Sequence, residues 1–254
     1  MTTPKKGAAQ TRHPETAILH DGRDPARQHG FVNPPAYRGS TVLFPTLDAL
    51  EAYDEQPFRY GRHGTPTTAA LEDAIARLEG GARTLLTASG YQAVTTAILA
   101  FVKTGDHVLM VDSVYQPTRK FCDTILARLG VTTTYYDPLV GAGIADLIRD
   151  ETRVVFLESP GSLTFEMQDV GAIAKAARAR DAAVLMDNTW ATGLYFRPIE
   201  HGVDVSINAC TKYIVGHADA MLGAITTNAR TARLVEEARA PLGACPGSEE
   251  TYLG

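Results

Sequence analysis

Four residues of this sequence have types and positions that could support chemistry. Lys212 lies in the run N-A-C-T-K-Y-I-V-G-H-A-D, downstream of Asp187, which ends the run V-L-M-D. Far upstream, Gly90 lies in the turn T-A-S-G-Y, and Tyr115 follows another apolar run. A lysine can form a Schiff base, a buried carboxylate can keep a ring nitrogen protonated, and a glycine turn before a helix can bind phosphate. An aromatic ring near a strand end can stack on a flat ligand.

Taken together, these residues predict a site for pyridoxal phosphate (PLP). Lys212 would carry the cofactor, and Asp187 would let its ring act as an electron sink. The backbone N–H groups of Gly90 and Tyr91 would bind the phosphate at the start of a helix, and Tyr115 would stack on the ring. Each signal is weak alone, but their order along the chain favours one shared site.

Rigid elements must position these residues, and the sequence predicts a mostly parallel α/β sheet with helices on both faces. The predicted strands are apolar with little polar alternation in the second half of the chain, which is typical of strands covered on both sides. Residues at helical spacing predict helices over Thr68–Glu79, residues 93–102 and Asp169–Arg180. Ligands of such sheets bind at the carboxyl ends of the strands, where the candidate residues fall. The seven predicted strands are Thr84–Thr87, His107–Asp112, Thr132–Asp137, Arg153–Glu158, Ala183–Asp187, Val203–Cys210 and Gly223–Thr227.

The first sixty residues differ from the rest of the chain. They hold seven prolines and show little periodicity before Leu47. We therefore expect an N-terminal arm over residues 1–60, extended across a partner subunit, and a cofactor-binding large domain over residues 61–254.

Composition excludes several classes of protein. With 254 residues, 44% of them hydrophobic and 21% charged, the chain can bury a sizeable core. The net charge of −5 disfavours nucleic acid or an anionic membrane as a partner, because such partners are usually met by excess positive charge. A small-molecule ligand is expected instead.

Cysteine usage and the N-terminus predict a cytoplasmic location. The three cysteines are widely spaced and odd in number, so they form neither a disulfide framework nor a Cys-x-x-Cys metal site; they are Cys122, Cys210 and Cys245. The first twelve residues lack the apolar segment of a secretion signal, and no apolar stretch approaches the roughly 20 residues of a membrane span. His217 and Asp219 have no second ligand pair at useful spacing, so no metal is expected.

The motifs around these residues resemble those of the Cys/Met-metabolism family of fold-type-I PLP-dependent enzymes, from about Leu19 to the last residue. Within the family, the resemblance is greatest to the bacterial enzymes that cleave cystathionine. The motifs that carry it are Y-G-R-H-G-T-P-T from Tyr60, L-E-G-G-A from Leu78, G-D-H-V-L-M from Gly105, F-L-E-S-P-G-S from Phe156, D-N-T-W from Asp187 and T-K-Y-I-V-G-H-A-D-A-M from Thr211.

The resemblance implies roles for the central residues of the site. Lys212 would be the Schiff-base lysine, Asp187 the partner of the pyridine nitrogen, and Tyr115 the stacking ring. Relatives often have a serine three residues before the lysine, whereas this chain has Ala209. The phosphate would then have one hydroxyl ligand fewer.

Further ligands implied by the resemblance surround the phosphate. Gly90, Tyr91 and Thr211 would bind it directly. Tyr60 and Arg62 resemble a pair contributed by a neighbouring subunit. In the expected reaction, Tyr115 or Tyr60 would help Lys212 to protonate the leaving sulfur. A homodimer would therefore be the smallest catalytic unit, and a homotetramer is equally compatible.

The reaction implied is β-elimination of L-cystathionine to homocysteine, pyruvate and ammonia, a carbon–sulfur lyase step of methionine biosynthesis. Ser162, in E-S-P-G-S, stands where γ-acting relatives commonly have Asn. Cystathionine γ-synthase, γ-lyase and sulfhydrylase activities remain the alternatives. Family members continue into a smaller C-terminal domain that closes the site and supplies an arginine for the substrate carboxylate. We expect that domain to be absent from this chain, which leaves a truncated, non-catalytic PLP-binding protein as a further alternative.

Overall fold

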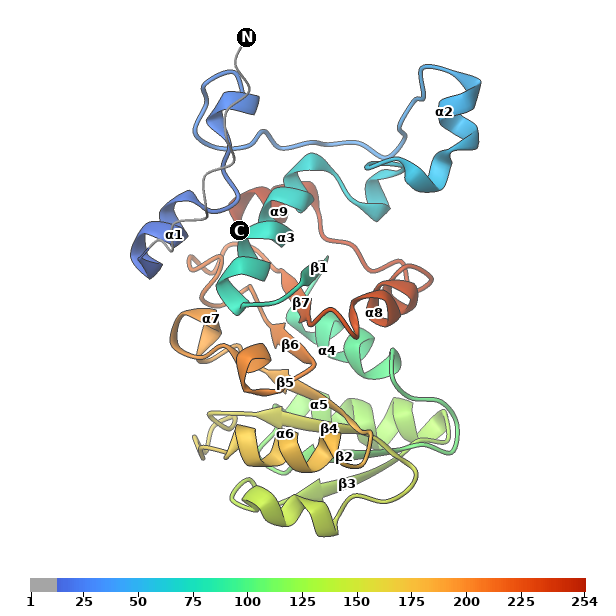
Figure 1. Cartoon of the computed structure of the whole chain (residues 1–254), viewed down its shortest axis with the longest axis vertical. Coiled ribbons are helices and arrows are strands. Elements are labelled where there is room, and N and C mark those ends of the chain that lie inside the picture. Colours follow the sequence, from blue (N-terminus) through green and yellow to red (C-terminus); the bar gives the residue numbers. More distant parts are fainter. Residues whose placement is uncertain (1–12) are drawn as a thin grey trace.

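A seven-stranded sheet runs through the computed structural model, which describes residues 13–254 (Figure 1). The strand order is β1-β7-β6-β5-β4-β2-β3, and β7 alone runs antiparallel to its neighbours. This mostly parallel sheet confirms the predicted α/β fold. The strands are β1 Arg83–Thr87, β2 His107–Val111, β3 Thr132–Tyr136, β4 Thr152–Glu158, β5 Ala183–Asp187, β6 Val205–Asn208 and β7 Gly223–Thr227.

Six of the seven strands lie within about one residue of their predicted ends, and the exception is β6. The sequence predicted a strand over Val203–Cys210, but β6 ends at Asn208. The backbone N–H of Ala209 donates to Thr189 Oγ1, at 2.8 Å, instead of continuing the ladder. A side chain from the neighbouring turn thus ends the strand before the lysine loop.

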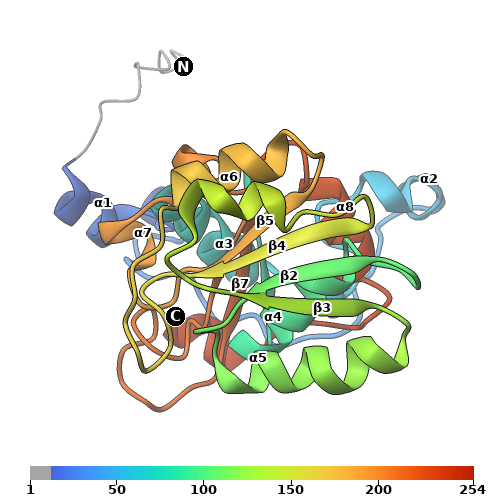
Figure 2. The same cartoon turned by 90° about the horizontal axis from the view of Figure 1, so that it is seen from below.

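Helices cover both faces of the sheet. Figure 2 shows α6 on one face and α4 and α5 on the other. The helix predicted from Thr68 begins two residues earlier, because Thr65 caps it and Pro66 occupies its first position. The α-helices that follow residue 65 are α3 Pro66–Glu79, α4 Gly90–Leu99, α5 Gln116–Phe121, α6 Val170–Arg178, α7 Thr192–Tyr195, α8 Ala232–Arg239 and α9 Ser248–Leu253.

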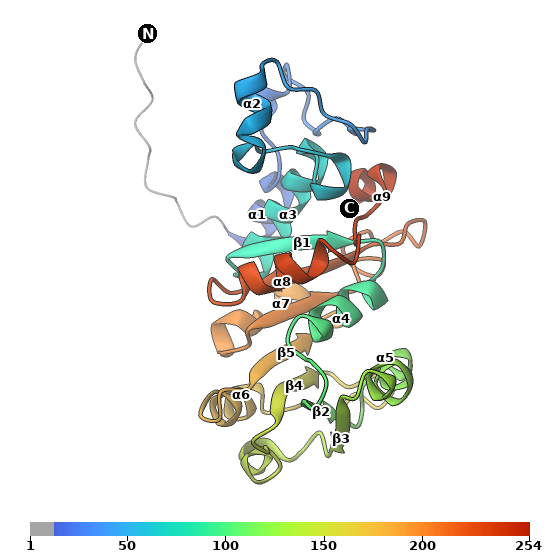
Figure 3. The same ribbon diagram turned by 90° about the vertical axis from the view of Figure 1, so that its right-hand side faces the viewer.

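Residues 13–60 lie beside and beyond α3, at one end of the molecule (Figures 1 and 3). They contain two short helices, α1 Pro14–His20 and α2 Leu47–Glu51, and an isolated bridge between Thr41 and Tyr60. The predicted arm over residues 1–60 begins outside the described range. The first twelve residues, which lack the apolar segment of a secretion signal, lie wholly outside it. The division at residue 60 therefore stays a prediction.

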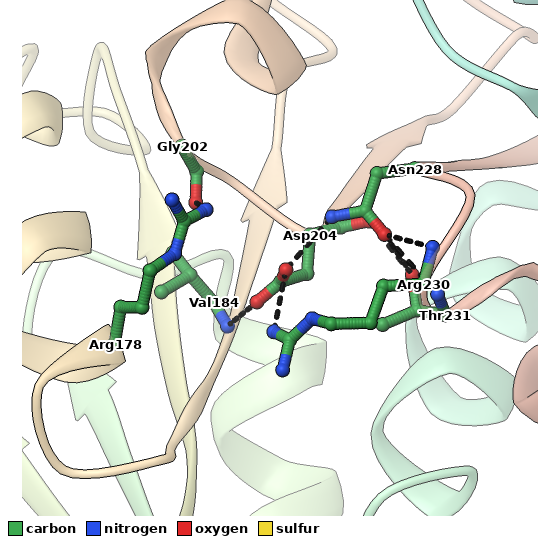
Figure 4. A network of polar contacts seen from close by, with 7 residues as sticks. All are labelled: Arg178, Val184, Gly202, Asp204, Asn228, Arg230 and Thr231. Atoms are coloured by element: carbon green, nitrogen blue, oxygen red, sulfur yellow. Dashed lines mark hydrogen bonds and ion pairs between the residues drawn. The ribbon is translucent and has the colours of Figure 1, made fainter.

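The amino ends of β5 and β6 and the carboxyl end of the antiparallel β7 are joined by one buried carboxylate (Figure 4). Asp204 is 1% exposed and accepts hydrogen bonds from the Val184 N–H, from Asn228 Nδ2 and from the Arg230 guanidinium. Its backbone carbonyl accepts a bond from the Thr231 hydroxyl. This network fixes the sheet at the end opposite to the candidate site.

The described residues contain no helix long and apolar enough to cross a membrane. Within the same range, no group of three or more His, Cys, Asp or Glu side chains is arranged to hold a metal ion.

Candidate active site

Two acidic side chains end neighbouring parallel strands. Asp187 is the last residue of β5 and Glu158 the last of β4, and the two lie opposite one another in the strand register. Asp187 is 9% exposed, and its Oδ1 accepts a hydrogen bond from the Thr189 N–H at 3.0 Å. The parallel ladder therefore places two carboxyl groups side by side at the carboxyl edge of the sheet, where ligands of such folds bind.

Burial strongly affects the protonation of this pair. It raises the pKa of Glu158 to about 9, and the negative charge of Asp187 contributes to the same shift. Burial also raises the pKa of Asp187, while hydrogen bonds from Thr189 act to lower it. Two buried carboxyl groups without a cation favour retention of a proton. A positively charged group bound beside them would let both ionise.

Lys212 lies close by, on the turn that follows β6. Its backbone N–H donates to the Ala209 carbonyl, and its carbonyl accepts from Gly216, which closes a tight loop. The side chain is exposed and lines a pocket of about 900 Å³ that also contains Glu158, Thr189 and Thr211 in its wall. The lysine and the carboxyl edge of the sheet thus face the same cavity.

The glycine turn directly contacts the lysine loop. Ser89 caps α4 by accepting a hydrogen bond from the Gln92 N–H, and Gly90 is the buried first residue of that helix. A Cβ atom on Gly90 would lie 2.3 Å from the Cβ of Ala209. Only glycine allows this approach, so the start of α4 and the lysine loop form one surface. The N-terminus of α4 offers backbone donors and a positive dipole end to an anion.

Tyr115 is held beside the acidic pair by its backbone. Its N–H donates to Glu158 Oε2 at 2.7 Å, and the side chain is 48% exposed. The residue precedes α5 as its N-cap, so the ring extends from a strand-to-helix loop at the same sheet edge. This position leaves the ring available for a flat ligand.

The other two predicted phosphate ligands, Tyr91 and Thr211, differ in exposure and in the hydrogen bonds that they make. Tyr91 is the second residue of α4 and is 44% exposed. The hydroxyl of Thr211 accepts a hydrogen bond from the Leu222 N–H at 3.0 Å and donates to the Leu222 carbonyl at 3.2 Å. Thr211 would have to exchange the latter contact for a phosphate oxygen.

Tyr60 and Arg62 do not join this pocket. They form a local cation–π contact, with the Arg62 guanidinium 5.2 Å from the centre of the Tyr60 ring, and neither residue lines the cavity. Within one chain the structure therefore brings together Lys212, Glu158 and Thr211 but leaves this pair outside.

Aromatic side chains line the outer part of the pocket. Trp190 contacts Phe165 and Tyr213, with ring centres 6.1 and 5.9 Å apart, and all three lie in the pocket wall. Ser162 and Leu163 complete the wall on the side of the E-S-P-G-S motif. The pocket is thus polar at the sheet edge and largely apolar at its rim.

Residues 15–254 match the model of the family described as Cys/Met metabolism PLP-dependent enzyme. The chain belongs to this family. The cofactor of a PLP-dependent family is PLP, in agreement with the four residue types from which the site was predicted.

Relatives of this chain include a protein of Rhizobium johnstonii that is 53% identical over 237 residues. The matched residues cover 93% of this chain and 60% of that protein. The cystathionine beta-lyase MetC of Escherichia coli is 42% identical over 245 residues, covering 94% of this chain and 62% of the relative. A solved structure of cystathionine gamma-lyase from Lactobacillus plantarum, complexed with L-serine, superposes with a TM-score of 0.88 at 29% identity over 95% of this chain and 62% of that one. The chain spans about three fifths of the length of these proteins.

The residues present in this family member fit PLP. The buried acidic pair lacks a cation, which a protonated pyridine ring would supply. The start of α4 at Gly90 packs on the lysine loop and offers backbone donors to an anion, and Lys212 lies in the pocket wall. A carboxyl group that favours a cation and the lysine amine thus line one cavity, and the start of α4 packs on the lysine loop.

Sequence reasoning missed three residues that shape the site. Glu158 was considered only for the choice of reaction, although it ends a strand as Asp187 does. Ser89 directly precedes the glycine of the turn, a position typical of a helix cap. Thr189 links the turn after β5 to the lysine loop through Ala209, and no local pattern indicates a contact of this kind.

Proposed function

We propose that this chain carries the catalytic lysine and cofactor site of a PLP-dependent carbon–sulfur β-lyase acting on L-cystathionine. The observation that supports this most is the pocket shared by Lys212 and Glu158, the strand neighbour of Asp187, in a chain of the Cys/Met metabolism family. The name of the Escherichia coli relative supports cystathionine as the substrate.

When bound, PLP supplies an electron sink for the charge that develops on the α-carbon of an amino-acid substrate. Asp187 would hold the proton at the ring nitrogen, because its carboxylate is buried and fixed by the Thr189 N–H. The start of α4 at Gly90 would bind the phosphate, and Tyr115 would pack on one face of the ring.

Lys212 would move the protons of the reaction. Its amine, in the pocket wall, would take the α-proton of the substrate and return a proton to the leaving sulfur, with help from Tyr115 or Tyr60. The carbon–sulfur bond then breaks and releases homocysteine, while the remaining three-carbon fragment hydrolyses to pyruvate and ammonia. Exclusion of water by the apolar rim around Trp190 would protect these steps.

The preference for β- over γ-elimination rests on Ser162. This side chain lines the pocket where γ-acting relatives commonly have Asn. Incubation with L-cystathionine should release pyruvate rather than 2-oxobutanoate. Release of 2-oxobutanoate would instead favour the γ-lyase hypothesis. A bound cofactor without either product would favour a non-catalytic PLP-binding protein.

We also propose a homodimer or homotetramer in a reducing, cytoplasmic setting. Tyr60 and Arg62 lie outside the pocket of their own chain, as a pair donated to a neighbouring subunit would. Cys122 and Cys210 are buried free thiols and Cys245 is half-buried, which suits a compartment where thiols stay reduced.

A further inference from the structure

Behind the cofactor site lies a second buried carboxyl group, that of Glu79. It is the last residue of α3 and is 0% exposed. The helix is stopped directly after it by Gly80, which adopts the left-handed conformation (φ 69°). An acidic side chain rarely lies fully inside a protein unless specific donors hold it.

The donors to Glu79 come from the two segments that carry the site. Ser206, in β6, donates its hydroxyl to Glu79 Oε2 at 2.6 Å, and Asn188 donates its amide to the same oxygen at 3.2 Å. Asn188 directly follows Asp187, and β6 leads into the loop of Lys212. One carboxyl oxygen therefore joins the element that ends in the acidic residue to the element that leads to the lysine.

The turn after β5 is held in place at several further points. The backbone N–H of Asn188 donates to the Ile207 carbonyl at 2.8 Å, and its side-chain amide also donates to the Phe196 carbonyl at 3.0 Å. Gly193 packs so closely on the end of α3 that a Cβ there would lie 2.4 Å from the Leu78 carbonyl oxygen. The position of Glu79 relative to the turn is thus fixed.

Unsatisfied polar atoms gather around the same carboxyl group. Glu79 Oε1, Asn188 Oδ1 and both side-chain polar atoms of Asn208 are buried without a hydrogen-bond partner. Burial raises the pKa of Glu79, and the hydrogen bonds from the Ser206 and Asn188 side chains act against that shift. Keeping such a polar cluster in the core costs stability. An apolar core would hold the same segments together without that cost, so a purely structural role does not account for the cluster.

We propose that Glu79 is a positioning residue of the cofactor site. Through Asn188 it fixes the turn that begins at Asp187, and through Ser206 it fixes the strand that delivers Lys212. The inference rests on the proposed assignment of Lys212 and Asp187 to PLP.

The test uses the whole chain loaded with PLP, and the readouts are the dissociation constant of PLP and the pH midpoint of its Lys212-dependent visible absorbance. Glu79→Ala removes the acceptor, and the dissociation constant should rise by about tenfold or more, as for other residues that orient the direct ligands of a site. The pH midpoint should shift as well. Glu79→Gln keeps an acceptor oxygen for Ser206 and Asn188 and should stay within about threefold of the unmodified chain.

Asp204→Ala provides the matched control. Asp204 is about as buried as Glu79 and also joins several segments (Figure 4). It directly precedes β6, at the end of the strand away from the lysine loop. Its loss should lower the urea midpoint of unfolding while leaving the dissociation constant and pH midpoint unchanged. If Glu79→Ala behaves like Asp204→Ala, its role is structural only and the proposal is overturned.

If Glu79→Ala does not fold, Ser206→Ala tests the positioning role instead, because it removes only the hydrogen bond from Ser206 to Glu79. A shifted pH midpoint with several-fold weaker binding supports the proposal, and unchanged values overturn it. Absence of Lys212-dependent absorbance in the unmodified chain would overturn the cofactor assignment itself. If the unmodified chain shows this absorbance but the Glu79 and Ser206 variants keep its dissociation constant and pH midpoint, only the positioning role is overturned.

Discussion

Two adjacent carboxyl groups, Glu158 and Asp187, are the residues whose chemistry most depends on the cofactor. Parallel strands bring them side by side, and burial raises the pKa of both. In the cofactor-free chain the pair should retain a proton near neutral pH. Binding of a positively charged ring should release that proton, so the site is electrostatically matched to a cation.

A pH dependence of stability follows for the cofactor-free chain. The pKa of Glu158 rises from its usual 4.5 to about 9, so the folded chain keeps a proton that the unfolded chain loses. The free energy of unfolding should therefore fall as the pH rises from about 4.5 to about 9. Glu158→Gln cannot ionise and should flatten this slope. Urea unfolding at pH 5, 7 and 9 measures it, and an equally steep slope in the variant would refute the assignment.

Sequence patterns located the strand ends and turns that carry the predicted ligands of the site, but not the residues that support them. Lys212, Asp187 and Gly90 lie at strand ends or turns, which apolar runs and turn residues indicate. The contact of Ser206 with Glu79 joins residues far apart in the chain, and a single sequence contains no signal for such pairs. The hydrogen bond from Ala209 to Thr189 was missed for the same reason.

At the level of elements, the sheet was predictable because β2, β4 and β5 are apolar runs buried along most of their length. The strand order and the antiparallel direction of β7 were not, because they depend on pairings between distant segments. The shortened β6 shows how one side chain from a neighbouring turn overrides an apolar pattern. It also creates the irregular backbone that the lysine loop requires.

The contact between α4 and the lysine loop can be tested with one glycine substitution. Gly90→Ala would place a methyl group 2.3 Å from Ala209 Cβ, and separating the two backbones should destabilise the fold by about 1–3 kcal/mol. Cofactor affinity should fall too, since the start of α4 moves. Thermal unfolding and PLP titration measure both effects.

Gly171→Ala is the matched control within a helix. A Cβ there would meet only Asp169 Oδ1, at 3.9 Å, near the start of α6. It should be neutral or stabilising by up to about 1 kcal/mol. Equal effects of the two substitutions would show that the close approach at Gly90 has no special role.

At the scale of the whole molecule, the position of Tyr60 and Arg62 outside the pocket suggests that subunits share their sites. Mixing Lys212→Ala with Arg62→Ala chains should then restore intact sites, because one subunit of a mixed dimer combines its own lysine with its partner's arginine. Random pairing would restore about a quarter of all sites. The readout is the fraction of sites that bind PLP with the affinity of the unmodified chain.

Dilution provides the control for this experiment. The restored fraction should disappear when the two variants are mixed at concentrations too low for dimers to exchange or form. No restoration at high concentration, with each variant folded, would mean that each chain builds its site alone.

The most direct test of the cofactor assignment is the visible absorbance of the purified chain with PLP, compared with that of Lys212→Ala. Lys212 lies in the pocket wall with Glu158, Asp187 pairs with Glu158 in the sheet, and Gly90 packs on the lysine loop. This arrangement predicts a visible band in the unmodified chain that survives gel filtration. The Lys212→Ala chain should remain folded but lose that band. A band of equal strength in both chains, or none in either, would contradict the assignment of Lys212 to the cofactor.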